Sequence, residues 1–261
     1  MNSSGTGTPP SPRAQASAKA PKTSDDPSST GFPYGRGPLK FSATGASLKD
    51  EDGQDQSLVL NGSTGYATAT GPVVDETGSF TVSARVRLDS AGLAKQPVGY
   101  RAAVFSQAAP AGKESSWALW VEKPAADTYL WKFGRTAVDA TGKVTDTGLV
   151  TAQEPISPKE LNSWVDLTGV FDAAETFTDD DGQQQLGMTH LYIGQFPQQP
   201  EGEAGFATPQ QGSGDLTAGN ARLAGTTSHY LPGALAELRV WTGAMTADQV
   251  RSQVLAAPDD A

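Results

Sequence analysis

Residues 79–88 read Ser-Phe-Thr-Val-Ser-Ala-Arg-Val-Arg-Leu, and this stretch decides the fold. Its apolar and polar residues alternate strictly, so an extended chain places every apolar side chain on one face and every polar one on the other. Valine and threonine also favour the pleated, half-covered surface of a sheet. The stretch therefore predicts a half-buried antiparallel strand, and at roughly 3.3 Å per residue it can run the full height of a sandwich.

Short apolar segments separated by turn residues continue from Leu39 onward, at the spacing typical of an all-β sandwich. Thr246 and Gln249 have the spacing of a capping box, which predicts one short C-terminal helix. The predicted fold is all-β, a two-sheet antiparallel sandwich over residues 39–256 with a short tail over 257–261. Strands are expected at Tyr100–Gln107, Ser116–Glu122, Thr128–Arg135, Trp164–Phe171, Leu186–Gln195 and Tyr230–Trp241, and a hairpin tip at Asp179–Gly182.

The N-terminal segment has a different composition. Residues 1–31 contain no Leu, Ile, Val or aromatic residue, so they have little with which to offset the entropy of ordering. We expect residues 1–38 to form a disordered tail or linker. Within it, residues 32–38 carry Phe32, Tyr34 and Arg36, which either dock into a groove on another protein or pack on this domain's own edge.

The overall composition excludes several classes of partner. The 261 residues carry a formal net charge of −10, which opposes binding to nucleic acid or anionic lipid. No stretch approaches the roughly 20 apolar residues needed to span a bilayer, so membrane insertion is not expected. Cysteine is absent, which removes disulfides, thiolate nucleophiles and cysteine-based metal sites. No signal peptide is visible in the sequence.

The order of motifs resembles a known family. The motifs are Leu58-Val-Leu-Asn-Gly-Ser-Thr-Gly-Tyr66, Gly71-Pro-Val-Val-Asp75, Ser79-Phe-Thr-Val-Ser-Ala84, Trp164-Val-Asp-Leu-Thr-Gly-Val-Phe-Asp172, Leu191-Tyr-Ile-Gly-Gln195 and Gly233-Ala-Leu-Ala-Glu-Leu-Arg-Val-Trp241. Together with the Met245-Thr-Ala-Asp-Gln-Val250 helix, they resemble LamG-like jellyroll domains of the concanavalin A-like lectin/glucanase superfamily, especially those of secreted actinobacterial proteins. The resemblance implies a jellyroll with ligands on its concave face or rim loops, and an extracellular location.

Three positions depart from that family pattern. Ala84-Arg85-Val86 stands where such domains commonly have Ser-Ala-Trp-Val, and Leu235-Ala236-Glu237 lacks the first acid of Gly-x-Ile-Asp-Asp. Leu191-Tyr-Ile-Gly-Gln195 also lacks the usual Asn. Losing that acid and that Asn argues against a calcium site built on those positions.

Enzymatic motifs are missing from the sequence. The Glu-x-Asp-x-x-Glu run that the resemblance implies for glucanases does not occur, and His190 and His229 have no Gly-x-Ser-x-Gly beside them. No cofactor is therefore expected, and calcium is the one metal worth weighing. Its candidate ligands lie in the acidic turns Asp50–Asp55 and Asp179–Gly182, where solvated carboxylates are the simpler interpretation.

Surface residues on predicted strands and loops give the candidate ligand or partner surface. Trp117 and Trp164 are expected in the core, whereas Trp120 is out of phase with Leu119 and Val121 and faces outward if those two are core residues; both an exposed and a buried Trp120 fit the sequence. Arg85 either serves recognition or pairs with an acid such as Glu122. The full set is Arg85, Arg87, Trp120, Tyr192 and His229.

Two functions follow from these features. The first is a non-catalytic extracellular binding module that recognises a glycan or a protein through the jellyroll surface. The second is a structural adaptor of a secreted assembly, such as a toxin or a cell-surface particle, docking through residues 32–38. A glycosidase is disfavoured.

Overall fold

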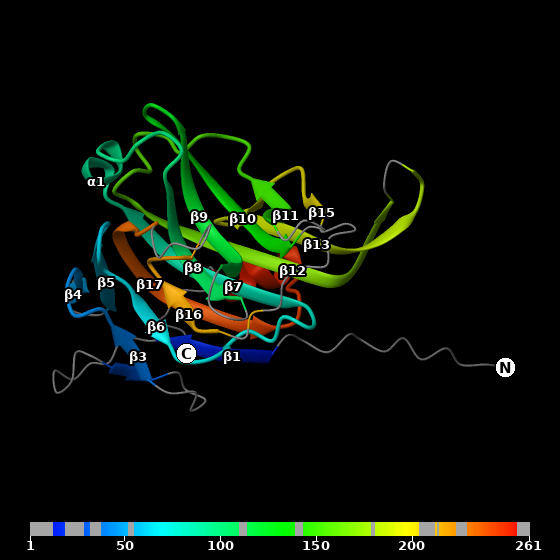
Figure 1. Cartoon of the computed structure of the whole chain (residues 1–261), viewed down its shortest axis with the longest axis horizontal. Helices are drawn as coiled ribbons and strands as arrows, with labels where there is room; N and C mark the ends of the chain where they lie inside the picture. The colour runs from blue at the N-terminus through cyan, green and yellow to red at the C-terminus, as the bar shows by residue number, and fades with distance from the viewer. Residues whose placement is uncertain are drawn as a thin grey trace.

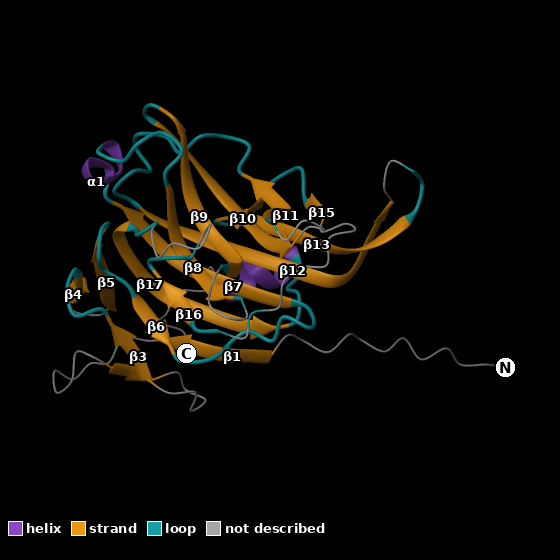
Figure 2. Cartoon of the chain, viewed as in Figure 1, coloured by secondary structure: helices purple, strands orange, loops and turns teal. Residues whose placement is uncertain are grey.

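The computed structural model describes residues 13–18, 29–31, 38–51, 55–109, 114–138, 143–178, 181–203, 212, 214–222 and 229–254. Over these ranges the chain forms two antiparallel sheets that face each other, which confirms the predicted all-β sandwich (Figure 1, Figure 2). Among the same residues, no helix has the length and apolar character needed to cross a membrane.

The first sheet, of nine strands in the described residues, is built around β7 (Phe80–Leu88). β7 pairs on one side with β12 (Trp164–Thr178) and on the other with β17 (Pro232–Thr242). The strand order is β14-β13-β12-β7-β17-β5-β4, while β15 also pairs with β13 and β1 with β17. The remaining strands are β14 (Phe196–Pro197), β13 (Gln184–Ile193), β5 (Asp55–Asn61), β4 (Ala46–Glu51), β15 (Gly202–Glu203) and β1 (Arg13–Ala18).

The second sheet has eight strands over the described ranges, in the order β11-β10-β9-β8-β16-β6-β3-β2. Its central strands are joined by short connections, as the closely spaced apolar runs predict. The strands are β11 (Val144–Thr151), β10 (Thr128–Val138), β9 (Ser115–Ala125), β8 (Arg101–Ala108), β16 (Leu216–Ala218), β6 (Ala67–Ala69), β3 (Pro38–Phe41) and β2 (Ser29–Gly31).

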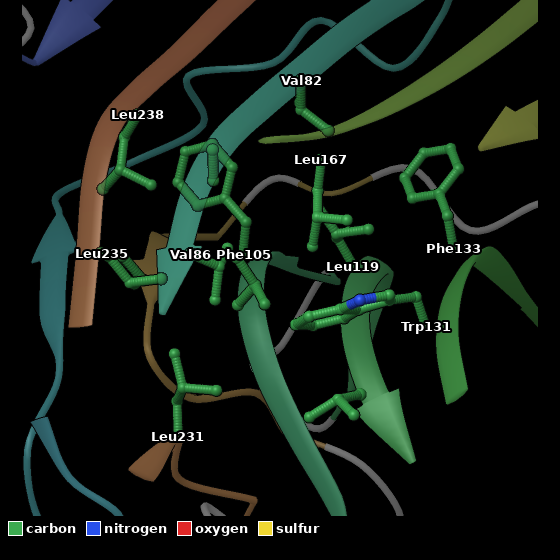
Figure 3. Close-up of a cluster of buried hydrophobic side chains, with 14 of the residues drawn as sticks. Val82, Val86, Phe105, Leu119, Trp131, Phe133, Leu167, Leu231, Leu235 and Leu238 are labelled. Atoms are coloured by element: carbon green, nitrogen blue, oxygen red, sulfur yellow. The ribbon is translucent and has the colours of Figure 1, made fainter. Parts of the chain in front are cut away.

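The core lies between the two sheets. Val82 and Val86 of β7 face Phe105 and Leu119 of the second sheet, and each of these side chains is at most 1% exposed (Figure 3). Phe80 adds ring contacts that join the sheets, with centroid distances of 5.5 Å to Trp117 and 6.5 Å to Phe133. The apolar face predicted for residues 79–88 is confirmed.

Two described parts of the N-terminal segment pair with strands of the sandwich, while the tail or linker expected over residues 1–38 stays a prediction. Residues 13–18 pair with β17, and residues 29–31 pair with β3. β17 pairs with β5 only over Pro232–Leu235, so its edge from Leu238 to Thr242 is open to another strand. Pairing with an open edge uses backbone groups and needs no apolar side chains, which is why composition gave no sign of it.

The described residues contain two helices, of which the C-terminal one was predicted from the sequence and the other was not. α2 (Ala247–Val254) has the predicted capping box: the Thr246 amide donates to Gln249 Oε1 at 2.9 Å, and the Gln249 amide donates to Thr246 Oγ1 at 3.3 Å. The sequence did not predict α1 (Ser90–Ala94). β12 and β13 form the predicted hairpin, whose tip residues 179–180 lie outside the described residues.

Candidate functional site

The structure divides the five predicted site residues between the two sheets. Trp120 and His229 lie with the eight-stranded sheet, whereas Arg85, Arg87 and Tyr192 lie with the nine-stranded sheet. They therefore do not form one site. The predicted docking residues Phe32, Tyr34 and Arg36 lie outside the described residues.

Arg85 pairs with acids of its own sheet. Its Nη1 lies 3.5 Å from Glu237 Oε1, and its Nε lies 3.9 Å from Asp166 Oδ1. The suggestion of Glu122 as its partner is wrong, because β12 and β17 flank β7 whereas Glu122 belongs to the other sheet. Burial raises the pKa of Asp166, and Arg85 opposes that rise.

Trp164 lies under the two arginines of β7. The Cζ atoms of Arg87 and Arg85 are 4.6 Å and 5.8 Å from the centroid of its ring. The expectation of a core Trp164 is wrong, whereas Trp117 is fully buried in the core as predicted. The alternation of the strand indicates this direction. Leu167 is a core residue, and Trp164 is three residues away, so Trp164 lies on the opposite face of the sheet.

The other end of this sheet face is covered by the C-terminal region. Tyr192 is only 6% exposed and packs with Val170, Trp241, Met245 and Val250, the last of which belongs to α2. Burial raises the pKa of Tyr192, and Glu201 and Glu175 raise it further. Tyr192 is therefore not accessible to a ligand in this structure.

His190 lies beside Tyr192 and is held by two carboxylates. Its Nε2 lies 2.8 Å from Glu175 Oε2, and its Nδ1 lies 3.1 Å from Glu201 Oε1. Both carboxylates can accept only when both ring nitrogens carry hydrogen. Leu191 faces the core and His190 the opposite side, as the alternation predicts.

The described part of the chain offers few candidates for metal ligation. There, no three His, Asp or Glu side chains gather in a way that could hold a metal ion. The acidic turns at 50–55 and 179–182 extend into residues that are not described, so calcium at either turn stays a prediction.

A charged cluster lies on the outer face of the eight-stranded sheet. Trp117, Leu119 and Val121 belong to the core, so Trp120 and Glu122 of β9 face the other way, as predicted. β8 and β10 flank β9 and place Arg101 opposite Glu122 and Lys132 opposite Trp120. We call the following set the Arg101 cluster: Arg101, Trp120, Glu122, Lys132 and Asp146.

Arg101 connects the members of this cluster. Its Nε lies 3.3 Å from Glu122 Oε2, and its Nη1 lies 3.3 Å from Asp146 Oδ2. Lys132 Nζ approaches the same Glu122 oxygen at 3.1 Å. Arg101 and Asp146 keep 31% and 29% of their side chains exposed, which leaves donors and acceptors available to a ligand.

Trp120 supports Arg101 rather than presenting its own face. The Arg101 Cζ lies 5.6 Å from the centroid of the Trp120 ring, and Trp120 is 3% exposed. A stacked guanidinium is attracted to the face of an indole ring and is held in place by it. Trp120 therefore points away from the core but is buried beneath Arg101, and it does not present an exposed ring face.

His229 adjoins the cluster through the backbone of Arg101. Its Nδ1 donates to the Arg101 carbonyl at 3.0 Å, so Nδ1 carries the hydrogen and Nε2 is the acceptor of the neutral ring. Burial lowers the pKa of His229 from its usual 6.5; the hydrogen bond to the Arg101 carbonyl opposes this effect, and the positive charge of Arg101 adds to it. The neutral ring is therefore the favoured form at neutral pH.

Sequence reasoning missed Arg101, Lys132 and Asp146. Lys132 stands between Trp131 and Phe133, two core residues, so its outward direction could have been read from the strand. Lys132 lies in one cluster with Arg101 and Asp146 because of the strand order β11-β10-β9-β8. The alternation within a single strand does not predict that order.

Known structures share this fold. Domain 4 of AbnA, a GH43 extracellular arabinanase from Geobacillus stearothermophilus solved with arabinotriose, is 15% identical over 93% of this chain and 98% of its own, with a TM-score of 0.59. The botulinum neurotoxin type G receptor binding domain is 12% identical over 92% and 50%, with a TM-score of 0.57. The serotype D ligand binding domain with N-acetylneuraminic acid is 10% identical over 91% and 49%, with a TM-score of 0.58.

This chain spans about half the length of the two toxin domains. At such identities the likeness establishes the fold alone. No curated protein sequence matches the chain. The family model Laminin_G_3, described as the concanavalin A-like lectin/glucanases superfamily, matches residues 61–251. The chain therefore belongs to this family, as its motifs predict.

Proposed function

We propose that the chain is a non-catalytic module that binds a neutral glycan at the Arg101 cluster. The observation that carries this proposal is the convergence of Arg101, Lys132, Glu122 and Asp146 on the outer face of one sheet. A sugar hydroxyl both donates and accepts hydrogen bonds. Adjacent guanidinium and carboxylate groups therefore suit a pair of neighbouring hydroxyls.

Charge favours a neutral sugar over an acidic one. The cluster contains two cations and two carboxylates, so its charges balance, and the whole chain carries −10. That excess of acid repels an anionic glycan at long range. Arabinotriose, the sugar named with the arabinanase domain, is neutral, and its binding there supports the same class of ligand here.

The absence of catalysis and the extracellular setting belong to the same proposal. The sequence lacks the Glu-x-Asp-x-x-Glu run expected of a glucanase of this superfamily. The arabinanase that contains the similar domain 4 is described as extracellular. Incubating the protein with every sugar it binds and analysing the products is expected to show no cleavage, and fractionating the native host is expected to recover the protein outside the cell.

Calorimetric titration with neutral oligosaccharides, beginning with arabinotriose, tests the binding site. Arg101→Ala is expected to lower the affinity about tenfold or more, because it removes charge-assisted hydrogen bonds of about 1.5–3 kcal/mol. Arg85→Ala, on the opposite sheet, is the matched control and should bind like the wild type. Equal losses in the two variants, or preferential binding of acidic sugars, contradict the proposal.

A further inference from the structure

A row of half-buried aromatic side chains continues from the Arg101 cluster along one end of the eight-stranded sheet. The rings of Tyr100 and His229 lie 6.2 Å apart, and those of Tyr66 and Tyr230 lie 6.3 Å apart. The Tyr100 hydroxyl donates to the Tyr230 carbonyl at 2.5 Å, which joins the two pairs. Each of the four residues is partly exposed.

The backbone places these residues on successive strands. The amide of Ala103 in β8 donates to the His229 carbonyl, and the Leu231 amide donates to the Gly219 carbonyl just after β16. Residues 229–231 therefore continue the line of β16, between β8 and β6. Tyr66 immediately precedes β6.

The row thus crosses the strands in a fixed order. It runs from Glu122 on β9 to Arg101 on β8, then to His229 and Tyr230, and then to Tyr66. Neighbouring strands lie about 4.8 Å apart, so the three intervals from Glu122 on β9 to Tyr66 span about 14 Å, the length of about three linked sugar rings.

The chemistry of the row suits sugars. Tyr66 and Tyr230 do not belong to the core cluster or to the side chains packed against it, whereas Tyr100 packs against the core. A half-exposed tyrosine offers a ring face for stacking and a hydroxyl for hydrogen bonding. His229 adds an acceptor at Nε2, because its Nδ1 is committed to the Arg101 carbonyl.

We infer that this row extends the site into one for a linear neutral oligosaccharide of about three residues, which lies across the strands from Glu122 of the Arg101 cluster to Tyr66. The inference rests on the proposed function, since the Arg101 cluster supplies the first contacts. It adds that chain length determines affinity, and that Tyr230 and Tyr66 contact the residues farther from Arg101.

Titration with arabinose, arabinobiose, arabinotriose and arabinotetraose, and with the corresponding cello-oligosaccharides, tests this inference. Affinity is expected to rise with each residue up to the trisaccharide and then to level off. Tyr230→Leu and Tyr66→Leu are expected to lower the affinity for the trisaccharide about fivefold or more and to leave that for the monosaccharide unchanged. Leucine keeps the apolar bulk, and melting temperatures check that both variants fold.

Phe196→Ala is the matched control, because Phe196 is an exposed aromatic residue, 65% exposed, on β14 of the other sheet. It should bind all the sugars like the wild type. If the trisaccharide binds no tighter than the monosaccharide, or if the leucine variants bind it normally, the extended site is refuted while the Arg101 site stands. If the wild type binds no sugar of either series, the proposed function itself fails, and the inference fails with it.

Discussion

The guanidinium of Arg135 lies 2.9 Å from the carboxylate of Glu76 inside the sandwich, where the two side chains are 2% and 1% exposed. The second Glu76 oxygen accepts hydrogen bonds from Ser116 at 2.6 Å and Gln107 at 2.7 Å. Burial raises the pKa of Glu76, against the lowering effect of Arg135. This ion pair links the segment before β7, which contains Glu76, to β10 of the eight-stranded sheet, which contains Arg135.

Arg135→Met is expected to destabilise the protein by about 3–5 kcal/mol, because it leaves the Glu76 charge buried without its cation. The double variant Arg135→Met, Glu76→Leu should recover much of that loss, since it leaves no buried charge. Urea unfolding of the two variants and the wild type measures the free energies. A double variant no more stable than Arg135→Met contradicts this account.

The direction of Arg135 could be read from the sequence, but its partner could not. Trp131, Phe133 and Arg135 share one phase of β10, so two core residues predict that the arginine also points inward. Glu76 lies 59 positions earlier in a loop, and loops carry no alternation from which a direction follows. The same limit applies to Arg101 and Asp146, because their ion pair joins two strands that are not neighbours in the sheet, and alternation within one strand does not predict it.

Residues 79–88 show the same division between what a strand pattern predicts and what it does not. The alternation predicts the two faces of β7, and the apolar face is confirmed, whereas only the Arg85 and Arg87 end of the polar face is exposed. It does not predict that α2 and the residues before it cover one end of the polar face. Thr81 and Ser83 are therefore buried, while Arg85 and Arg87 remain half-exposed.

Thr81 anchors the segment that leads into α2. Its Oγ1 donates to the Gly243 carbonyl at 2.9 Å and accepts from the Met245 amide at 3.0 Å. Thr81→Val keeps the shape but leaves both backbone groups unpaired, which is expected to cost about 1–3 kcal/mol. Thr81→Ser keeps the hydroxyl and is expected to retain most of the stability. Chemical denaturation of the two variants measures their free energies of unfolding. Equal values for Thr81→Val and Thr81→Ser contradict the anchoring role.

His229 predicts a pH dependence of stability. Because its pKa is lowered in the folded state, the unfolded chain binds the proton first as the pH falls below 6.5. The contribution of His229 to the free energy of unfolding should therefore be complete above pH 6.5. It should decrease as the pH is lowered toward the folded-state pKa. His229→Asn keeps a hydrogen-bond donor and tolerates the φ of 85° at this position. The variant should show a flatter profile in urea titrations between pH 5 and 7.5, whereas an unchanged profile refutes the assignment to His229.

Arg85 provides the contrast to Arg135. Its side chain is 39% exposed, and its contacts with Asp166 and Glu237 are 3.9 Å and 3.5 Å long, so solvent screens both pairs. Arg85→Ala is therefore expected to change the free energy of unfolding by no more than about 1 kcal/mol. Thermal and urea unfolding beside Arg135→Met test this, because the two arginines differ mainly in burial. An Arg85→Ala variant that is unfolded at room temperature means that this arginine is part of the core, and that the faces of β7 are assigned the wrong way round.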